Sequence, residues 1–127
     1  NPLKELDIVY VARGSYRIGD VAMVSPSDVE TALTREIRRF RVNKDSNGEL
    51  DPYYLLYLLS TEAVQLQTKA RVLLDTTLPN IGDRYLSLVV PWAVDPEVRK
   101  SISNKVKHAL DAKWTAADDI RNLLEEA

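Results

Sequence analysis

The C-terminal part of this chain is committed to a single long helix. Asp95-Pro96 puts a good N-cap residue directly before a Pro at the first helical position, and neither Pro nor Gly occurs after that point. The sequence therefore predicts one continuous helix from Pro96 to the end of the chain, about 45 Å long at a rise of about 1.5 Å per residue. The preceding residues must supply the globular part of the fold.

Along the predicted helix, apolar and small residues recur at alternating spacings of four and three. These positions are Ile102, Val106, Ala109, Lys113, Ala116, Ile120 and Leu123. They form a heptad seam interrupted by Lys113, which is typical of a helix that lies along another helix. Such a seam can pack either against a helix from outside the chain or against the chain's own globular part. If the partner is another helix, the expected interface residues are Ile102, Val106, Ala109, Ile120 and Leu123.

The globular part is predicted to be α+β, with a small mixed β-sheet and packed helices. β-Rich runs predict strands at residues 8–13, 17–24, 36–42 and 85–90, with a tight turn at 14–16. Ser27 and Glu30 have capping-box spacing, so a short helical turn is expected within residues 25–33. Asp51-Pro52 predicts a helix start, and a second helical stretch is expected at about residues 61–73.

Composition excludes several classes of function. The 127 residues are 45% apolar and 28% charged, as in one globular domain, and there is no Cys and a single His, His108. Thiol chemistry, Cys-based zinc sites and sites built from several imidazoles are therefore excluded. The four Gly are scattered and no apolar run is long enough to span a membrane. We expect a non-catalytic binding or assembly module that needs no cofactor and no metal and acts in the cytoplasm, away from membranes.

Charge is unevenly distributed along the chain. The net charge is −2, yet residues 13–44 contain seven basic and four acidic side chains. A basic stripe on a mildly acidic chain is compatible with local contact to phosphates, although a solvated surface is its commoner meaning.

Several segments carry a more specific signal than composition. They are residues 7–19 (DIVYVARGSYRIG), 36–42 (EIRRFRV), 51–60 (DPYYLLYLLS), 76–81 (TTLPNI) and 86–91 (LSLVVP). In this order, they resemble the target recognition domains of type I restriction-modification specificity subunits. Asp75 stands where that family has Gly, a second Pro is missing soon after Pro91, and the family's opening strand is missing before Asn1. A related recognition domain fused to a DNA methyltransferase therefore fits as well, and the start at Asn1 suggests a piece of a longer protein.

The resemblance implies a division of labour along the chain. Residues 1–92 would recognise a short half-site in double-stranded DNA, and residues 93–127 would form the helical spacer. In the family, two spacer helices pair and dock DNA methyltransferase (modification) subunits, so a partner spacer helix or a second copy and these subunits are the implied partners. The expected DNA-binding residues are Arg13, Ser15, Tyr16, Arg17, Arg39, Arg41, Thr76, Thr77 and Asn80.

Each expected DNA contact has a structural alternative. Arg can bond guanine with two hydrogen bonds and Asn can do so with adenine, whereas Thr more often contacts phosphate. Residues such as Arg39 and Arg41 are more often solvated strand residues than base readers. Asn80 is equally consistent with an Asx turn, and Tyr16 with packing on the sheet. For the whole chain, the competing hypothesis is an assembly domain that acts through its C-terminal helix without binding DNA.

Overall fold

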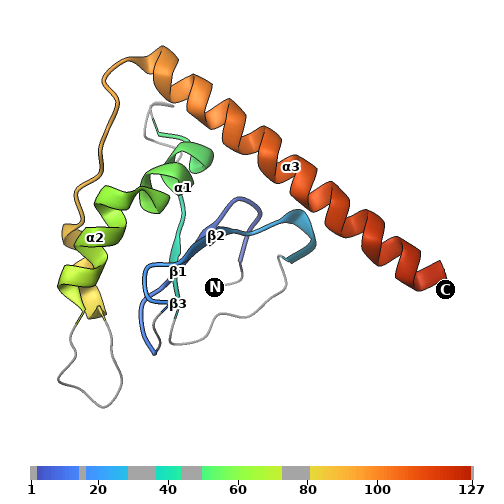
Figure 1. Ribbon diagram of the computed structural model, residues 1–127, viewed down its shortest axis with the longest axis horizontal. Coiled ribbons are helices and arrows are strands. Elements are labelled where there is room, and N and C mark those ends of the chain that lie inside the picture. The colour runs from blue at the N-terminus through green and yellow to red at the C-terminus, as the bar shows by residue number, and fades with distance from the viewer. Residues whose placement is uncertain (1–2, 15–16, 29–36, 44–49, 73–80, 127) are drawn as a thin grey trace.

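The computed structural model describes residues 3–14, 17–28, 37–43, 50–72 and 81–126 (Figure 1). The elements follow one another as β1 (Ile8–Val11), β2 (Val21–Met23), a 3-10 turn η1 (Pro26–Asp28), β3 (Ile37–Phe40), α1 (Pro52–Ser60), α2 (Glu62–Arg71), a 3-10 helix η2 (Gly82–Ser87) and α3 (Pro96–Glu126). The α+β class expected from the sequence is confirmed.

The described strands form one antiparallel sheet in the order β2-β1-β3. Ile8 pairs with Met23 on one side and with Phe40 on the other, and Val11 pairs with Ile37. The expectation of a mixed sheet was wrong for this part of the chain, because both pairings are antiparallel. All three strands are shorter than expected.

The prediction of a fourth strand at residues 85–90 was also wrong. Residues 82–87 form η2 instead, and the chain then runs on in extended form without pairing to a described strand. The side-chain amide of Gln67 serves in place of a neighbouring strand: its Nε2 donates to the Val89 carbonyl at 2.6 Å, and its Oε1 accepts from the Val89 N–H at 2.8 Å. The apolar run was misleading because Leu86 and Val89 are exposed.

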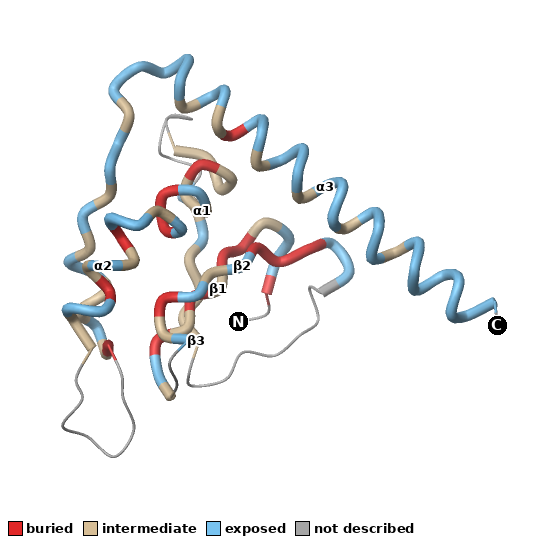
Figure 2. Tube along the Cα trace, in the orientation of Figure 1, coloured by how far each residue is buried: buried red, intermediate tan, exposed pale blue. Residues whose placement is uncertain are grey.

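The hydrophobic core lies between one face of the sheet and the helices α1 and α2 (Figure 2). Ile8 and Met23 from the sheet pack with Leu59 and Val64 from the helices. Beside them, Tyr10 is fully buried, contacts the rings of Phe40 and Tyr85, and shares a 3.0 Å hydrogen bond with Thr68 of α2.

The predicted start of α1 is confirmed in detail. Asp51 Oδ1 accepts a hydrogen bond from the Tyr54 N–H at 2.9 Å, and Pro52 occupies the first turn. The same oxygen accepts from Ser103 Oγ of α3 at 2.8 Å, so this cap also fastens the C-terminal helix to the domain.

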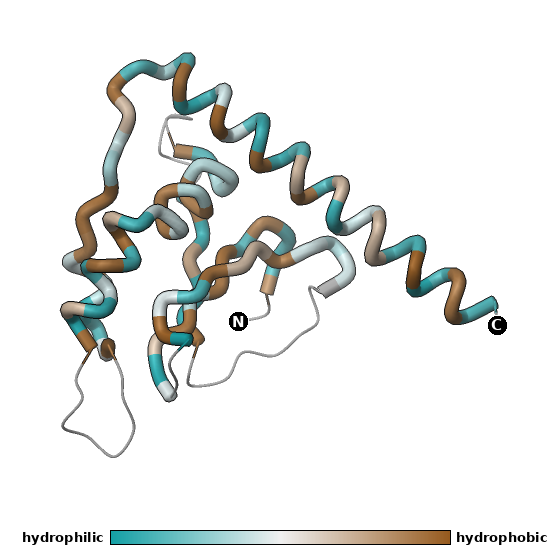
Figure 3. Tube along the Cα trace, viewed as in Figure 1, coloured by the Kyte–Doolittle hydropathy of each residue, from teal (hydrophilic) through white to brown (hydrophobic). Residues whose placement is uncertain are grey.

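The long C-terminal helix is present without a break. α3 crosses α1 and extends past the sheet toward the C-terminus (Figure 1). Leu110 and Trp114 pack against the hydrophobic core, whereas the last turns carry exposed apolar side chains (Figure 3). Further along, Ser27 Oγ donates to Asp118 Oδ1 at 3.4 Å, so the helix contacts its own domain as far as Asp118 and presents its last turns outward.

Candidate nucleic-acid interface

The connection between β1 and β2 is the first part of the candidate site. Gly14 and Gly19 have φ of 99° and 97°, a region that L side chains rarely adopt. Two backbone hydrogen bonds join the strands beyond the β1–β2 pairing: Gly19 N–H donates to the Val11 carbonyl at 2.8 Å, and Val11 N–H donates to the Asp20 carbonyl at 3.0 Å. Glycine at these two positions lets the chain reverse sharply.

Arg13 and Arg17 are the described basic residues of this connection. Both are exposed, and Arg17 Nε donates to Asp20 Oδ2 at 3.3 Å. Two-thirds of the Arg17 side chain stays accessible in this ion pair, with an exposed fraction of 67%. Such an exposed pair contributes little stability, so the Arg17 guanidinium can exchange its carboxylate partner for another anion at low cost.

The connection is fixed onto the corner between α1 and α2. Gln65 Nε2 donates to the Gly19 carbonyl at 2.8 Å and to the Leu59 carbonyl at 2.9 Å. A Cβ at Gly19 would lie 2.9 Å from Thr68 Cγ2, so only glycine allows this close approach. Gln65 and Gly19 thus fix the β2 end of the connection, close to Arg17, against α1 and α2.

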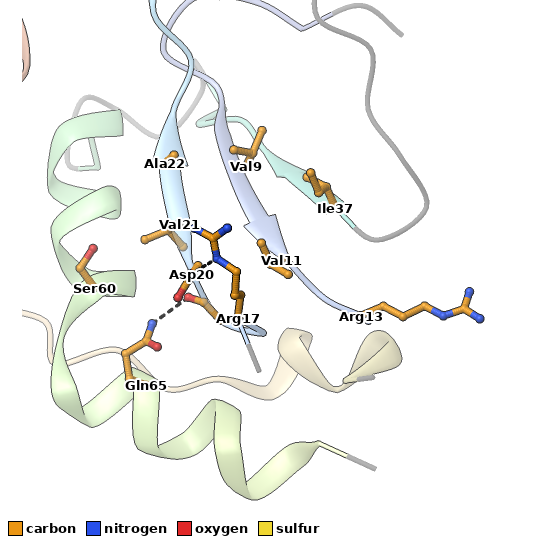
Figure 4. A pocket seen from close by; sticks show the side chains of 11 residues that line it. Val9, Val11, Arg13, Arg17, Asp20, Val21, Ala22, Ile37, Ser60 and Gln65 are labelled. Carbon is orange, nitrogen blue, oxygen red and sulfur yellow. Dashed lines mark hydrogen bonds and ion pairs between the residues drawn. The ribbon is translucent and has the colours of Figure 1, made fainter. Parts of the chain in front are cut away.

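The face of the sheet that turns away from the helices carries apolar side chains, of which Val9, Val11 and Ile37 are half-buried and Ala22 is exposed. Val9, Val11, Ala22 and Ile37 alternate with the buried residues of their strands and project to this outward side. They form the floor of a hollow of about 580 Å³ that Arg13, Arg17 and Asp20 also line, and that Val21, Ser60 and Gln65 line on the side of the helices (Figure 4). In Figure 4 the Arg17 guanidinium lies beside Asp20, between Val21 and Val11, and Arg13 points away beyond the end of β1.

Strand β3 adds a further cation to the outward side. Arg39 pairs with Val9 in the sheet register and therefore projects from the same face as Val9. Its neighbour Arg38 pairs with Tyr10 and projects from the opposite face. The expected alternation of β3, with Phe40 inward and Arg39 outward, is confirmed.

Arg41 has a definite structural partner. Its Nε and Nη2 donate to the two carboxylate oxygens of Asp7, each at 2.7 Å, and Asp7 is buried. Burial alone would raise the pKa of Asp7, but the hydrogen bonds from Arg41 and from the Lys4 backbone N–H, with the positive charges of Arg41 and Arg39, hold that pKa below its usual value. The fold therefore uses Arg41 to compensate a buried carboxylate, and a DNA contact by Arg41 stays a prediction.

Five of the expected DNA-binding residues lie outside the described residues: Ser15, Tyr16, Thr76, Thr77 and Asn80. The described ends of their two segments nevertheless meet. The Ile81 N–H donates to the Ala12 carbonyl at 2.9 Å, and both side chains are buried beside Tyr10. The residue before Arg13 and the residue after Asn80 are thus joined at the same end of the sheet, as two loops that share one surface require.

Sequence reasoning missed the apolar floor and the Gln65 support. The alternation of Val9 and Val11 with Ile8 and Tyr10 was present in the sequence, but a fully apolar run does not show which side faces the core. A Gln on an amphipathic helix carries no signal for a partner that is 46 positions earlier in the chain. The glycine at position 19 was a visible hint of close packing.

The expected helix interface is split by the structure. Ile102 and Val106 are half-buried in the monomer, and Ala109, Ile120 and Leu123 are exposed. The face of α3 on the domain includes Ser103, Leu110 and Trp114 instead. Leu110 and Trp114 bury more apolar area against the domain than Ala109, Lys113 and Ala116 of the predicted seam could offer.

Within the described ranges, no three His, Cys, Asp or Glu side chains are grouped so that they could hold a metal ion. No helix there combines the length and apolarity needed to cross a membrane. His108 is exposed on α3. In comparisons with known proteins, no family model and no curated protein matched the chain.

Proposed function

We propose that this protein is a sequence-specific DNA recognition module of a restriction-modification system. The observation that supports this function best is that Arg13 and Arg17 line the hollow at one end of the sheet, while Arg39 projects from the outward face of the same sheet. Arginine is the side chain best suited to both partners that duplex DNA offers, the phosphates and the guanine edge in the major groove.

The rest of the molecule suits such a role. A base-reading side chain needs a fixed aim, and the β1–β2 connection is tied by the Gln65 hydrogen bonds to α1 and α2. α3 extends rigidly from the same domain and would act as the spacer that docks DNA methyltransferase subunits. The parent is then a two-domain specificity subunit or a recognition domain fused to a methyltransferase.

Salt-dependent binding of the purified chain to duplex DNA tests the proposal. Phosphate contacts release counterions, so log K should fall linearly with log salt concentration. Arg17→Ala should weaken binding by about 1–3 kcal/mol if Arg17 reads a base, or flatten the salt slope by about one if it contacts a phosphate. Fluorescence anisotropy on a labelled duplex at several salt concentrations measures both quantities.

Arg121→Ala is the matched control for this experiment. Arg121 donates to Asp118 three positions earlier at 3.1 Å, and Arg17 donates to Asp20 three positions later, so both are exposed ion pairs of the same kind. The control should bind DNA like the parent, because Arg121 lies on α3. Equal binding by the parent, Arg13→Ala and Arg17→Ala would reject this surface, and absence of any salt slope would reject DNA binding.

A second function is favoured by a different observation. Ile120, Leu123 and Leu124 are exposed on the last turns of α3, which suits an assembly domain that acts through this helix. An assembly domain predicts concentration-dependent association without a salt-dependent affinity for DNA. The same salt titration therefore separates the two functions.

A further inference from the structure

The part of the hollow that lies on the outward face of the sheet has a floor of four aliphatic side chains, whereas Val21, Ser60 and Gln65 line the hollow on the side of α1 and α2. Val9 and Val11 come from β1, Ala22 from β2 and Ile37 from β3. None of these side chains can donate or accept a hydrogen bond, so the floor cannot read the polar edge of a base. Whatever rests on it must present an apolar group.

The rim of the same hollow is cationic. Arg13 and Arg17 stand at the end of the sheet with one carboxylate, Asp20, which already accepts from Arg17. Arg39 projects from the outward side as the register partner of Val9. A ligand that complements this hollow must therefore carry an apolar group with negative charges around it. An ordinary apolar protein surface lacks those charges.

Duplex DNA offers that combination in its major groove. The only apolar group on a base edge there is the C5-methyl of thymine, and phosphates line both sides of the groove. The groove also admits a two-stranded β-ribbon. β2 is the edge strand and pairs with β1, so the β1–β2 side of the three-stranded sheet is the part that would enter the groove. Val9 and Ala22 are register partners, so their side chains lie next to each other on the ribbon's outward face.

We propose that this apolar floor recognises thymine through its C5-methyl group, while Arg17 at the rim contacts an adjacent phosphate or guanine. The inference rests on the proposed function and makes it more specific, because it names the base that the sheet face selects. Loss of one methyl contact should raise the Kd about fourfold, because the free energy of burying one such group corresponds to about that change in affinity.

The test removes the methyl group and nothing else. A cognate duplex is first selected from a random pool with the full chain, and each thymine in it is then replaced in turn by deoxyuridine. We expect at least one replacement to weaken binding by the parent about fourfold. Val11→Thr should bind the thymine and uracil duplexes nearly equally, because a hydroxyl replaces a methyl on the floor while the β-branched shape is kept.

Val89→Thr is the control for this substitution. Val89 is an exposed residue of the extended segment after η2, so the same exchange there should preserve the preference for thymine. Circular dichroism and thermal unfolding establish that both variants are folded. An Ile37→Ala variant, which removes a different part of the floor, should lose the preference as well.

The outcomes separate this inference from the proposed function. Sequence-selective, salt-dependent binding with no thymine position sensitive to uracil would overturn the thymine contact and leave the DNA function standing. A preference for thymine that survives in both Val11→Thr and Ile37→Ala would overturn it too. If the parent selects no sequence and shows no salt slope, both fail. If the chain self-associates, Val11→Thr abolishes that association, and deoxyuridine does not change DNA affinity, then the floor binds a second copy of the chain and the proposal is overturned.

Discussion

The Asp7–Arg41 pair shows how a single charged residue can link distant segments of this small fold. Asp7 precedes β1 and is buried, with 2% of its side chain exposed, whereas Arg41 follows β3 and keeps 37% exposed. Besides the two Arg41 bonds, Asp7 Oδ2 accepts from the Lys4 N–H at 2.8 Å. A buried carboxylate is tolerated only when it is paired and hydrogen-bonded, so this pair fixes where the ends of the two strands lie.

Asp7→Asn should lower the free energy of unfolding by about 1–2 kcal/mol near neutral pH, because hydrogen bonds to a charged group are lost. The folded-state pKa of Asp7 is below its unfolded value, so its contribution is present above the unfolded pKa of about 3.9 and is lost as the pH falls through the folded pKa. The difference between parent and variant should therefore be constant above about pH 5 and shrink in acid. Urea unfolding at a series of pH values measures it.

Asp118→Asn provides the comparison for this titration. Asp118 accepts from Arg121 in an exposed ion pair on α3 and, at 3.4 Å, from Ser27 Oγ, and such exposed contacts contribute little to stability. Its removal should leave the unfolding curves unchanged at every pH. A difference for Asp7→Asn that grows as the pH falls would contradict the sign argued for this carboxylate.

At this scale the sequence could predict residue types but not partners. The alternation of β3 correctly placed Arg39 outward and Phe40 inward. It also grouped Arg41 with Arg39 as a solvated or DNA-facing residue, whereas the guanidinium turns to Asp7, 34 positions earlier. Such a long-range pair depends on how β1 and β3 come together, which a local pattern does not contain.

At the scale of the elements, the β1–β2 connection lies in close contact with α2 at Gly19. Gly19 sits against Thr68 and Gln65, and its φ of 97° is unfavourable for any other residue. Gly19→Ala should therefore lower the free energy of unfolding by about 2 kcal/mol or more, from backbone strain and from the clash with Thr68. It should also weaken DNA binding, because the connection that carries Arg17 must shift away from α2.

Gly82→Ala separates the two causes. Gly82 has a φ of 57°, an ordinary left-handed value that Ala adopts at a cost of about 1–2 kcal/mol. Chemical unfolding of both variants, with anisotropy on the same duplex, measures stability and binding together. Equal losses of stability and unchanged DNA binding in both variants would show that the close approach to α2 does not position the connection.

Helix starts were the most predictable elements, because their signal is local. Asp51-Pro52 and Asp95-Pro96 each contain the cap and the Pro that the observed helices use: the Tyr54 N–H bonds Asp51, and the Glu97 N–H bonds Asp95 at 2.9 Å. The strand expected at 85–90 failed for the opposite reason. Apolar periodicity does not reveal whether a neighbouring strand is present, and here the Gln67 side chain takes that place.

For the whole molecule, the decisive feature is that α3 contacts its own domain from its start to Asp118 and carries exposed apolar side chains on its last turns. Arg99 lies 4.5 Å from the centre of the Trp92 ring, Ser103 bonds the cap of α1, and Trp114 packs against the core. The sequence predicted one unbroken helix and left both of its packing modes open. Both parts of that prediction bear on function, since Ile120, Leu123 and Leu124 of the last turns are exposed to a partner.

Association through α3 should therefore depend on its last turns alone. Ile120 is 59% exposed, so Ile120→Asp places a charge in water and should leave the free energy of unfolding of the dilute monomer unchanged. In an assembly that buries this face, the same carboxylate is desolvated without a partner, and we expect association to weaken by at least about tenfold. Sedimentation velocity over a range of concentrations measures the association.

Trp114→Ala is the contrasting variant: it removes a half-buried ring from the core and should lower stability by about 2 kcal/mol at every concentration. If Ile120→Asp instead lowers stability at all concentrations without changing the sedimenting species, the last turns of α3 pack on the chain's own domain in solution. Spacing between two recognition modules could not then be set by this end of the helix.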